Sequence, residues 1–410
     1  MAHKHSNSAQ EPSYRRIYAH IIGWGMAVPE ERLTNEDLEA IVETSDDWIT
    51  ARTGIKERRI ANERESTTTL GFEAARRALE VADVLPQELD LIIVATSTPE
   101  SIFPSTASLI QDRLGASKAG AFDLSAACSG FVYGVKMAAD SIMAGSAKVA
   151  LVIGAETMSR VMDWQDRSTC ILFGDGAGAV VLKADTAEGG VLSSVLRSDG
   201  SGYDLLGIPT VGSCDINLPG ISANGHKMHK MFMNGGEVFK FATRVIGDSI
   251  QEAAEKAGIT IDEIDLIIPH QANERIIKSA ARNLKIDVGR FMNNVSRYGN
   301  TSAASIPIAL VEAIQEGRVR QGDYLAFVGF GGGLTWASMV VKWGVPKPEE
   351  RHAGRINRQR RQILYTAARW RSRWNRWKRR TSETISRIRP QRGRMSRLKH
   401  KIEQHDIDLK

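Results

Sequence analysis

The stretch from Ala121 to Ile142 constrains the fold of this chain most strongly. Apolar strand residues lead into Ser125–Gly130, a run of very small residues with one cysteine, and an apolar pattern with helical spacing follows. A strand that turns sharply into a helix is the geometry of a nucleophile elbow, and small residues let such a turn tighten. Cys128 would then lie at a helix N-terminus, where unpaired N–H groups and the helix dipole favour a thiolate. The alternative is that Cys128 is only a small buried apolar residue.

Strands and helices are expected to alternate on both sides of this stretch. Alternation at this pitch predicts an α/β fold with a mainly parallel or mixed sheet. After residue 190 the pattern begins again, so we predict two similar halves. The expected strands are 17–24, 91–96, 149–154, 266–268 and 324–328, and the expected helices are 67–82, 105–114, 131–142, 236–256, 274–284 and 303–316.

Three segments are expected to be irregular. The glycine-rich residues 173–180 open a strand without the Gly-Lys-Ser/Thr of a phosphate loop, which favours a tight packed turn. Residues 46–54 are expected to form a polar loop with one tryptophan and one arginine, and residues 329–333 a glycine loop after the last strand.

Charge is distributed very unevenly along the 410 residues. Residues 351–410 contain 20 Lys/Arg and 4 Asp/Glu, whereas residues 1–350 contain 34 and 44, so the basic character belongs to the C-terminal end. The three cysteines are too few and too scattered for a disulfide framework or a zinc site, so we expect a cytoplasmic protein. The polar N-terminal residues 1–16, with His3 and His5, are expected to be disordered, and no metal site is predicted.

Three polar side chains follow predicted buried strands or precede predicted helices. They are Cys128, His270 and Asn300. Because ligands of α/β sheets bind at the carboxyl ends of the strands, these side chains could share one face.

At this point the motifs resemble a known family. Residues 17–345 are similar to the thiolase superfamily and specifically to the β-ketoacyl-acyl-carrier-protein synthases III. The resemblance implies a homodimer with a five-layered αβαβα fold made of two similar halves. It rests on Ala126–Gly130, Phe173–Gly178, Pro269–Asn273, Tyr298–Ser302 and Gly329–Gly333, in the order of the family.

The resemblance also implies a reaction. Cys128 would take an acyl group from acyl-CoA, and malonyl-acyl-carrier protein would then enter and lose carbon dioxide. His270 and Asn300 would stabilise the enolate that forms, and the carbanion would attack the acyl-cysteine. Gly332 would contribute an oxyanion N–H group, and Phe330 would be the aromatic gate. No cofactor is implied, because acyl-CoA and malonyl-carrier protein are substrates.

Binding residues are implied in the same way. Phe103 would shape the acyl pocket of the partner subunit across the dimer. A pantetheine-contacting position of the family is Gly236 here, which departs from its usual polar residue. The implied CoA contacts are Trp48, Arg52, Thr44, Arg167 and Asn273, and the implied carrier-protein contacts are Lys240, Arg275 and Arg282.

The family does not explain residues 346–410. The predicted division is therefore an N-terminal half at 17–188 with the nucleophile, a C-terminal half at 189–345 with His270 and Asn300, and a basic extension. Ile356, Ile363, Trp370 and Trp377 recur every seven residues. A basic helix with this stripe would suit a membrane surface or an acidic partner, with no specific nucleic acid expected. The alternative is a disordered, solvated basic tail.

Other functions remain open at this stage. A cysteine hydrolase also uses Cys, His and Asn in this chain order, although the local papain-type signature is missing. Related condensing enzymes differ in their acceptor, as in polyketide or quinolone-type synthesis or head-to-head acyl-CoA condensation. The starter acyl chain depends on pocket shape and is not predicted.

Overall fold

The computed structural model describes residues 16–210, 225–344 and 355–388, with side chains of the last segment described at 357–381. The predicted disordered N-terminal residues 1–15, His3, His5 and Cys214 lie outside the described residues.

The first half is built on a five-stranded mixed sheet. Its strand order is β1-β7-β6-β4-β5, in which β4 is parallel to both β5 and β6, and β7 is antiparallel to its neighbours. The strands are β1 (Tyr18–Ala27), β4 (Leu91–Ala95), β5 (Gly120–Leu124), β6 (Val149–Thr157) and β7 (Asp175–Asp185), and the helices are α3 (Thr67–Ala82), α4 (Thr106–Leu114) and α5 (Gly130–Met143).

The second half repeats this topology. Its sheet has the order β8-β13-β12-β11 with the corresponding strand directions, and an isolated parallel bridge between Ile267 and Phe291 stands in the place of the fifth strand. The strands are β8 (Gly190–Ser198), β11 (Leu266–Pro269), β12 (Tyr324–Gly331) and β13 (Thr335–Lys342), and the helices are α7 (Gly235–Ala257), α8 (Glu274–Leu284) and α10 (Ser305–Gln315).

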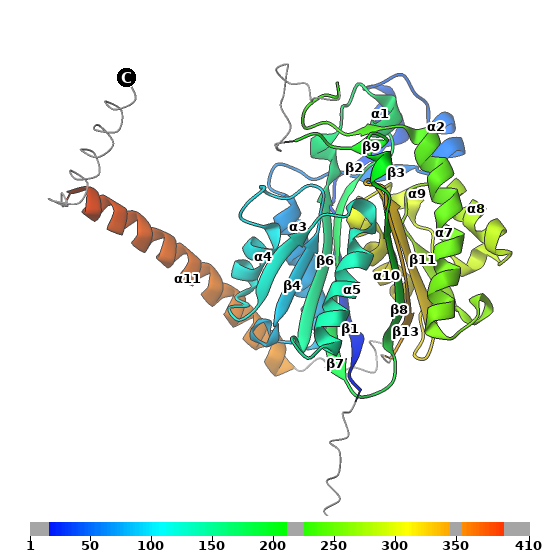
Figure 1. Cartoon of the computed structure of the whole chain (residues 1–410). Helices are drawn as coiled ribbons and strands as arrows, with labels where there is room; N and C mark the ends of the chain where they lie inside the picture. The colour runs from blue at the N-terminus through cyan, green and yellow to red at the C-terminus, as the bar shows by residue number, and fades with distance from the viewer. Residues whose placement is uncertain (1–15, 211–224, 345–354, 389–410) are drawn as a thin grey trace, which may run out of the picture.

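The two sheets enclose a central pair of helices. Phe131 of α5 and Ile306 of α10 belong to one buried cluster with Phe327 of β12, so both sheets pack against these helices. Helices α3 and α4 cover the outer face of the first sheet, and α7 and α8 cover that of the second (Figure 1). This arrangement confirms the predicted five-layered αβαβα fold of two similar halves.

Shorter elements complete the described body. They are β2 (Arg32–Thr34), β3 (Glu57–Arg59), β9 (Leu206–Gly207), β10 (Phe232–Met233), α1 (Asn35–Glu39), α2 (Asp46–Thr53), α6 (Arg167–Cys170) and α9 (Val295–Tyr298).

The structure corrects three local predictions. Residues 46–53 form helix α2 and not a loop, because Ser45 caps the first turn and Gly54 ends it in the left-handed conformation. The glycine-rich segment continues as strand β7 from Asp175, so it is not a turn. A Cβ at Gly178 would lie 2.6 Å from Pro307, which shows that this glycine lets α10 approach the sheet. Strand β12 also extends through Gly331 into the predicted glycine loop.

The C-terminal extension contains a long helix, α11 (Arg355–Ile388), which leaves the body beside α3 and α4 (Figure 1). No helix in the part of the chain that the structure describes has both the length and the hydropathy needed to cross a membrane.

Candidate active site

The two halves bring the three predicted catalytic side chains around one cavity. Cys128, His270 and Asn300 all line a cavity of about 880 Å³. Cys128 follows β5 of the first half, His270 follows β11 of the second half, and Asn300 precedes the central helix α10. The expectation that these residues share one face of the fold is therefore confirmed.

Cys128 lies in a tight elbow between β5 and α5. Ala127 has a left-handed backbone (φ 46°), and residues Ala127–Ser129 form one short 3₁₀ turn before the helix. A Cβ at Gly331 would lie 2.7 Å from the Cys128 backbone nitrogen, so only glycine permits this approach of β12. Both the predicted elbow and the role of small residues agree with this geometry.

The environment of Cys128 favours the thiol. Burial raises the pKa of Cys128 to about 12, and the negative charge of Glu156 contributes in the same direction, whereas the hydrogen-bond contact between Cys128 Sγ and the Ser302 hydroxyl group lowers it. The predicted preference for a thiolate at the helix N-terminus is therefore outweighed by burial in this pocket.

Ser302 connects Cys128 to a buried carboxyl group. The Cys128 Sγ lies 3.5 Å from Ser302 Oγ, and Ser302 Oγ donates to Glu156 Oε1 at 2.9 Å. Glu156 also accepts from the backbone N–H of Ser97 at 3.1 Å and the hydroxyl of Thr98. It is fully buried at the end of β6, and burial raises the pKa of its carboxyl group.

His270 is a buried, neutral imidazole. Its Nδ1 lies 2.6 Å from Ser305 Oγ, which in turn accepts from the backbone N–H of Gln271 at 3.4 Å. The Ser305 hydroxyl hydrogen can donate to Nδ1, and in that arrangement the ring proton lies on Nε2. Burial lowers the pKa of His270 to about 3, so the ring is uncharged at neutral pH.

Asn300 is oriented by the backbone around it. The side-chain Oδ1 of Asn300 accepts from the backbone N–H of Ser302 at 2.8 Å. The backbone N–H of Asn300 donates to the Leu172 carbonyl at 2.8 Å. Since Oδ1 is occupied, the amide NH₂ group is the one available to a ligand in the cavity.

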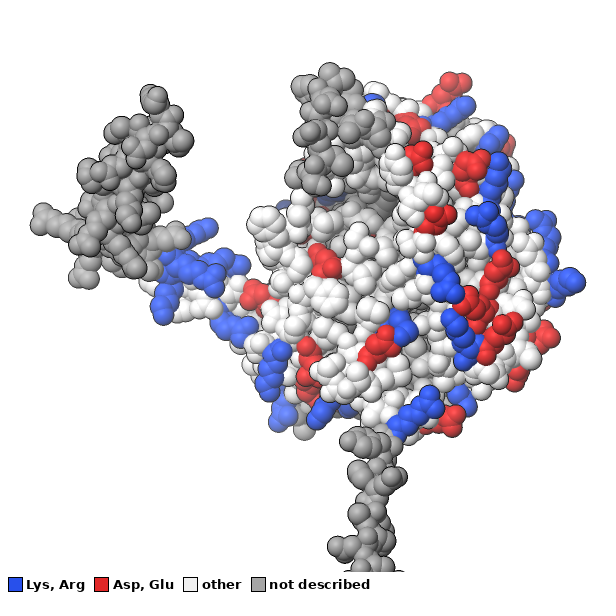
Figure 2. Space-filling view, in the orientation of Figure 1, with Lys and Arg blue, Asp and Glu red and all other residues white. Residues whose placement is uncertain are grey.

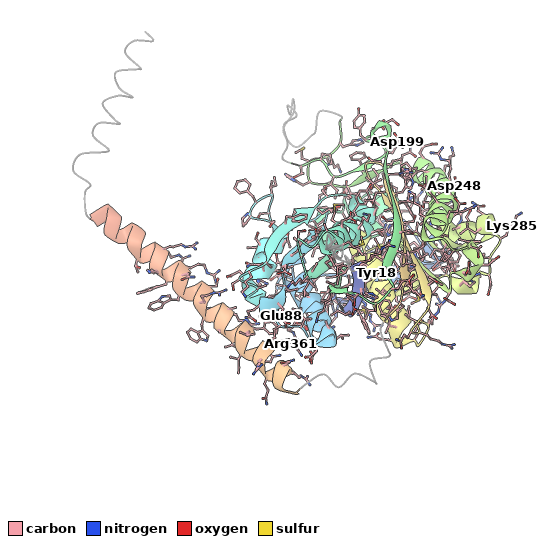
Figure 3. All side chains as sticks on the ribbon, turned by 60° about the horizontal axis from the view of Figure 1, so that its bottom comes forward. Tyr18, Glu88, Asp199, Asp248, Lys285 and Arg361 are labelled. Carbon is pink, nitrogen blue, oxygen red and sulfur yellow. The ribbon has the colours of Figure 1, made fainter. Side chains whose placement is uncertain are left out.

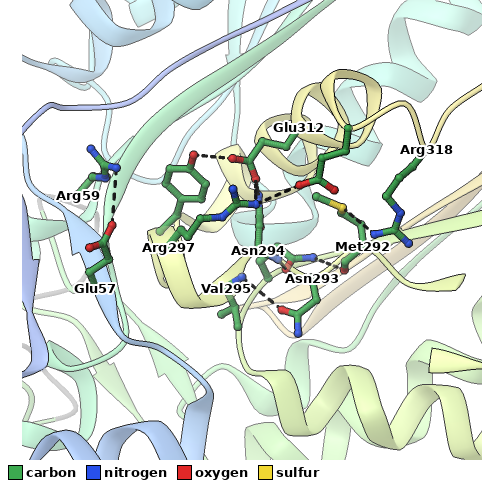
Figure 4. Close-up of polar contacts among 12 residues, drawn as sticks. Glu57, Arg59, Met292, Asn293, Asn294, Val295, Arg297, Glu312 and Arg318 are labelled. Carbon is green, nitrogen blue, oxygen red and sulfur yellow. Dashed lines mark hydrogen bonds and ion pairs between the residues drawn. The ribbon is translucent and has the colours of Figure 1, made fainter. Parts of the chain in front are cut away.

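A buried polar network holds the segment that leads to Asn300. Glu312 of α10 accepts from Asn294 Nδ2 at 2.7 Å, from Arg297 at 2.8 Å and from the Tyr298 hydroxyl at 2.6 Å (Figure 4). These bonds tie α9 to α10 and so limit the movement of the loop between them.

Phe330 and Gly332 also line the cavity. The Phe330 ring meets the His270 ring edge to face, with centroids 5.0 Å apart, and is almost fully buried. A Cβ at Gly332 would lie 3.0 Å from the Leu206 carbonyl oxygen and 3.7 Å from Ala127, which places this glycine close to the elbow.

Three predicted CoA contacts gather at one side of the cavity. The Arg52 guanidinium lies 4.6 Å and that of Arg167 5.3 Å from the Trp48 ring centroid. Asn273 caps α8 and donates from Nδ2 to the Arg52 carbonyl at 3.1 Å. Trp48, Arg52 and Asn273 line the cavity, whereas Arg167 and Thr44 lie outside its lining.

The remaining predicted binding residues divide into two groups. Lys240, Arg275 and Gly236 line the cavity, and the Arg275 guanidinium lies 5.3 Å from the Phe239 ring. Arg282 is exposed on α8 outside the cavity lining, and Phe103 is 85% exposed.

Sequence reasoning did not single out Ser302, Glu156 or Gly331 as functional residues. The only available signal for Glu156 was a carboxyl group at the end of the otherwise apolar run Val149–Thr157. Gly331 and Ser302 lay within quoted motifs, but their contacts with Cys128 depend on the folding of distant segments.

The duplicated five-layered fold with a buried cysteine pocket defines a thiolase-like protein. Residues 122–200 match the family described as 3-Oxoacyl-[acyl-carrier-protein (ACP)] synthase III, and residues 254–343 match its C-terminal part. A Beta-ketoacyl-[acyl-carrier-protein] synthase III of Desulfitobacterium hafniense is 53% identical over 323 residues, which are 79% of this chain and 97% of that protein. The chain belongs to the β-ketoacyl-acyl-carrier-protein synthase III family.

Solved structures agree with this assignment. The 3-oxoacyl-[acyl-carrier-protein] synthase III of Aquifex aeolicus is 48% identical with a TM-score of 0.73, covering 79% of this chain and all of that one. A priming β-ketosynthase of a polyketide biosynthetic pathway is 34% identical with a TM-score of 0.75, covering 83% of this chain and 99% of that one. Both family matches end before α11, which begins at Arg355.

Proposed function

We propose that this protein initiates fatty acid synthesis by decarboxylative condensation of an acyl-CoA starter with malonyl-acyl-carrier protein. The observation that carries the proposal is the convergence of Cys128, His270 and Asn300 on one cavity in a chain of this family.

In the first half-reaction, Cys128 acts as the nucleophile. Its sulfur forms a bond to the acyl carbonyl carbon, the carbon–sulfur bond to CoA breaks, and the thiol proton ends on the departing CoA sulfur. The buried cavity excludes water, which favours transfer over hydrolysis of the thioester. The N–H groups of Cys128 and Gly332 would hold the oxyanion.

In the second half-reaction, His270 and Asn300 stabilise an enolate. Malonyl-carrier protein loses carbon dioxide, and negative charge develops on its thioester oxygen. The Nε2–H of neutral His270 and the NH₂ of Asn300 are suitable donors for that oxygen. The carbanion then attacks the acyl-cysteine carbonyl, and the Cys128 sulfur leaves and regains a proton. Phe330 would act as the gate beside these groups.

The two long substrates would enter past the mouth of the cavity. Trp48 and Arg167 would bind the CoA adenine between them, with Arg52 and Thr44 near the nucleotide and its phosphates and Asn273 beside pantetheine. Because Gly236 has no side chain, one polar contact to pantetheine would be missing. The basic carrier-protein contacts would be Lys240, Arg275 and Arg282. The reaction needs no metal or organic cofactor, and we place it in the cytoplasm.

A homodimer is part of the proposal. Within the described residues β5 pairs only with β4, so its outer edge is open. Phe122 on this strand is 42% exposed, and the nearby Ile102 and Phe103 are 63% and 85% exposed. An open strand edge with exposed apolar side chains supports pairing with a second copy, in which Phe103 would reach the partner's acyl pocket.

Intact-mass analysis after mixing with acetyl-, isobutyryl- or octanoyl-CoA tests the proposal. We expect one acyl adduct that is absent in Cys128→Ala and is discharged by malonyl-carrier protein to a 3-oxoacyl product. Cys170→Ala is the matched control, because Cys170 is also buried but does not line the cavity. An adduct that only hydrolyses would indicate a hydrolase, and discharge by a different acceptor would indicate a related condensing enzyme.

A further inference from the structure

Helix α11 is attached to the body through the first part of its length. Arg361, whose side chain is 3% exposed, donates to Asp83 Oδ1 at 2.9 Å, and Asn357 donates to Asp83 Oδ2 at 3.0 Å. The Tyr365 ring meets Phe72 edge to face, with centroids 6.0 Å apart. These contacts hold one face of the helix against α3.

Close packing continues for one further turn. Ala368 is buried, and its Cβ would lie 3.1 Å from a Cβ added at Gly115, the residue that ends α4. From Arg369 to Arg380 all side chains are exposed except the half-buried Ser372. The helix therefore changes from a docked segment to a projecting one near residue 369. Figure 3 shows Arg361 where α11 meets the body and the free length of helix beyond it.

The projecting segment presents a stripe of exposed aromatic side chains. Trp370, Trp374 and Trp377 are 68%, 62% and 57% exposed, and the last two rings are 5.2 Å apart. At about 100° per residue, Ile363, which is 66% exposed, falls on the same side of the helix. Arg361, Tyr365 and Ala368 fall on the opposite side, so docking directs the stripe away from the body.

Positive charge borders this stripe on both sides. Residues 369–381 contain seven Lys or Arg and no Asp or Glu. By helical spacing, Arg371 and Lys378 flank one edge of the tryptophans, and Arg373 and Arg380 flank the other. Figure 2 shows Lys and Arg gathered along the described part of α11.

We propose that residues 363–381 of α11 form a docking surface for an anionic phospholipid membrane, with the helix lying along the interface. Tryptophan is favoured at the headgroup level, and arginines on both flanks can reach lipid phosphates. The docked opposite face would hold the enzyme body on the aqueous side. This inference is independent of the condensation chemistry.

Other occupants fit these features less well. In a dimer formed through two α11 helices, the seven Lys and Arg side chains of residues 369–381 in one copy would face the same seven in the other, and like charges repel. A duplex nucleic acid would accept the charges, but its bases are already stacked and paired and leave no face for an exposed tryptophan stripe. The membrane surface uses the charge and the aromatic side chains together.

Vesicle co-sedimentation of the full-length protein tests this proposal. The vesicles are phosphatidylcholine with or without phosphatidylglycerol, at low and at moderate salt. The test variant combines Trp370→Ala, Trp374→Ala and Trp377→Ala, which keeps every charge of the chain. The matched control combines Gln362→Ala and Asn375→Ala, at exposed positions of the same helix outside the stripe. Helicity and acylation of Cys128 show that each variant is folded.

We expect the wild type and the control to bind phosphatidylglycerol vesicles and the tryptophan variant to bind at least 10-fold more weakly. Equal binding of wild type and tryptophan variant would overturn the proposal, because charge alone would then account for it. Absence of vesicle binding by the wild type would also overturn it. A stripe-dependent change in oligomeric state, or stripe-dependent retention of nucleic acid in place of vesicles, would assign the surface to that partner.

Discussion

Replacement of His270 by asparagine tests the buried, neutral imidazole most directly. His270 is 2% exposed, and burial lowers its pKa from 6.5 to about 3. In the unfolded chain the ring is accessible to water and regains its ordinary pKa. Between these two values the unfolded state binds more protons than the folded state. The contribution of His270 to stability is therefore present above pH 6.5 and is lost as the pH falls toward 3.

The size of this effect follows from the two pKa values. At pH 5 the unfolded ring is protonated and the folded ring is not, which destabilises the folded state by about 2 kcal/mol relative to pH 7. Below pH 5 the loss continues to grow until the pH reaches the folded pKa of about 3. His270→Asn has no group that titrates in this range, so the variant lacks this part of the acid sensitivity.

Urea unfolding at pH 7 and pH 5, at one protein concentration, measures the difference. We expect the wild type to lose about 2 kcal/mol more between these pH values than His270→Asn. His229→Asn is the control, because His229 is exposed and should retain the acid sensitivity of the wild type. Equal losses in wild type and His270→Asn, or a His270 ring NMR signal that titrates near pH 6.5, would refute the reasoning.

Three further substitutions have expected outcomes. Gly331→Ala places a Cβ 2.7 Å from the Cys128 nitrogen and should lower the rate of Cys128 acylation ~100-fold or more. Gly200→Ala is the control, because a Cβ there has no neighbour within 4 Å and should leave the rate unchanged. Equal acylation rates of the two variants would contradict this prediction. Arg361→Ala removes the buried partner of Asp83, which should weaken the docking of α11 by about 2 kcal/mol and make the helix more sensitive to proteolysis. Arg358→Ala should have a smaller effect, because Arg358 is more exposed. Identical digestion patterns of the two variants would argue against docking. Trp48→Ala should raise KM for acyl-CoA several-fold with little change in kcat, and a loss confined to kcat would exclude ground-state binding.

Local sequence signals predicted much of the fold. Helices 67–82 and 274–284 were predicted with their observed bounds, and each begins after a capping residue, Ser66 and Asn273. Helix α2 was missed because it buries only Ile49 and Thr53 and has no apolar periodicity. Its capping residues were the remaining signal, and they were not used.

The three central residues of the candidate site were predicted from their places at strand ends or before a helix. Cys128 and His270 follow strands, and strand ends converge by topology. Glu156 reaches the site through Ser302, which depends on how α10 crosses the first sheet and has no local pattern. The docked face of α11 could not be predicted either, because it also depends on contacts between distant segments. The tryptophan stripe is periodic in sequence, but the partner of Arg361 is Asp83, 278 residues away.

Glu156 and Ser302 should move the ionisation of Cys128 in opposite directions. The Glu156 charge raises the pKa of the thiol, and the Ser302 hydrogen bond lowers it. Glu156→Gln should therefore shift alkylation of Cys128 by iodoacetamide to lower pH, and Ser302→Ala should shift it to higher pH. Peptide mass analysis resolves Cys128 from Cys170, which serves as the internal control. Shifts in the same direction would mean that loosening of the pocket, and not local electrostatics, determines the reactivity of Cys128.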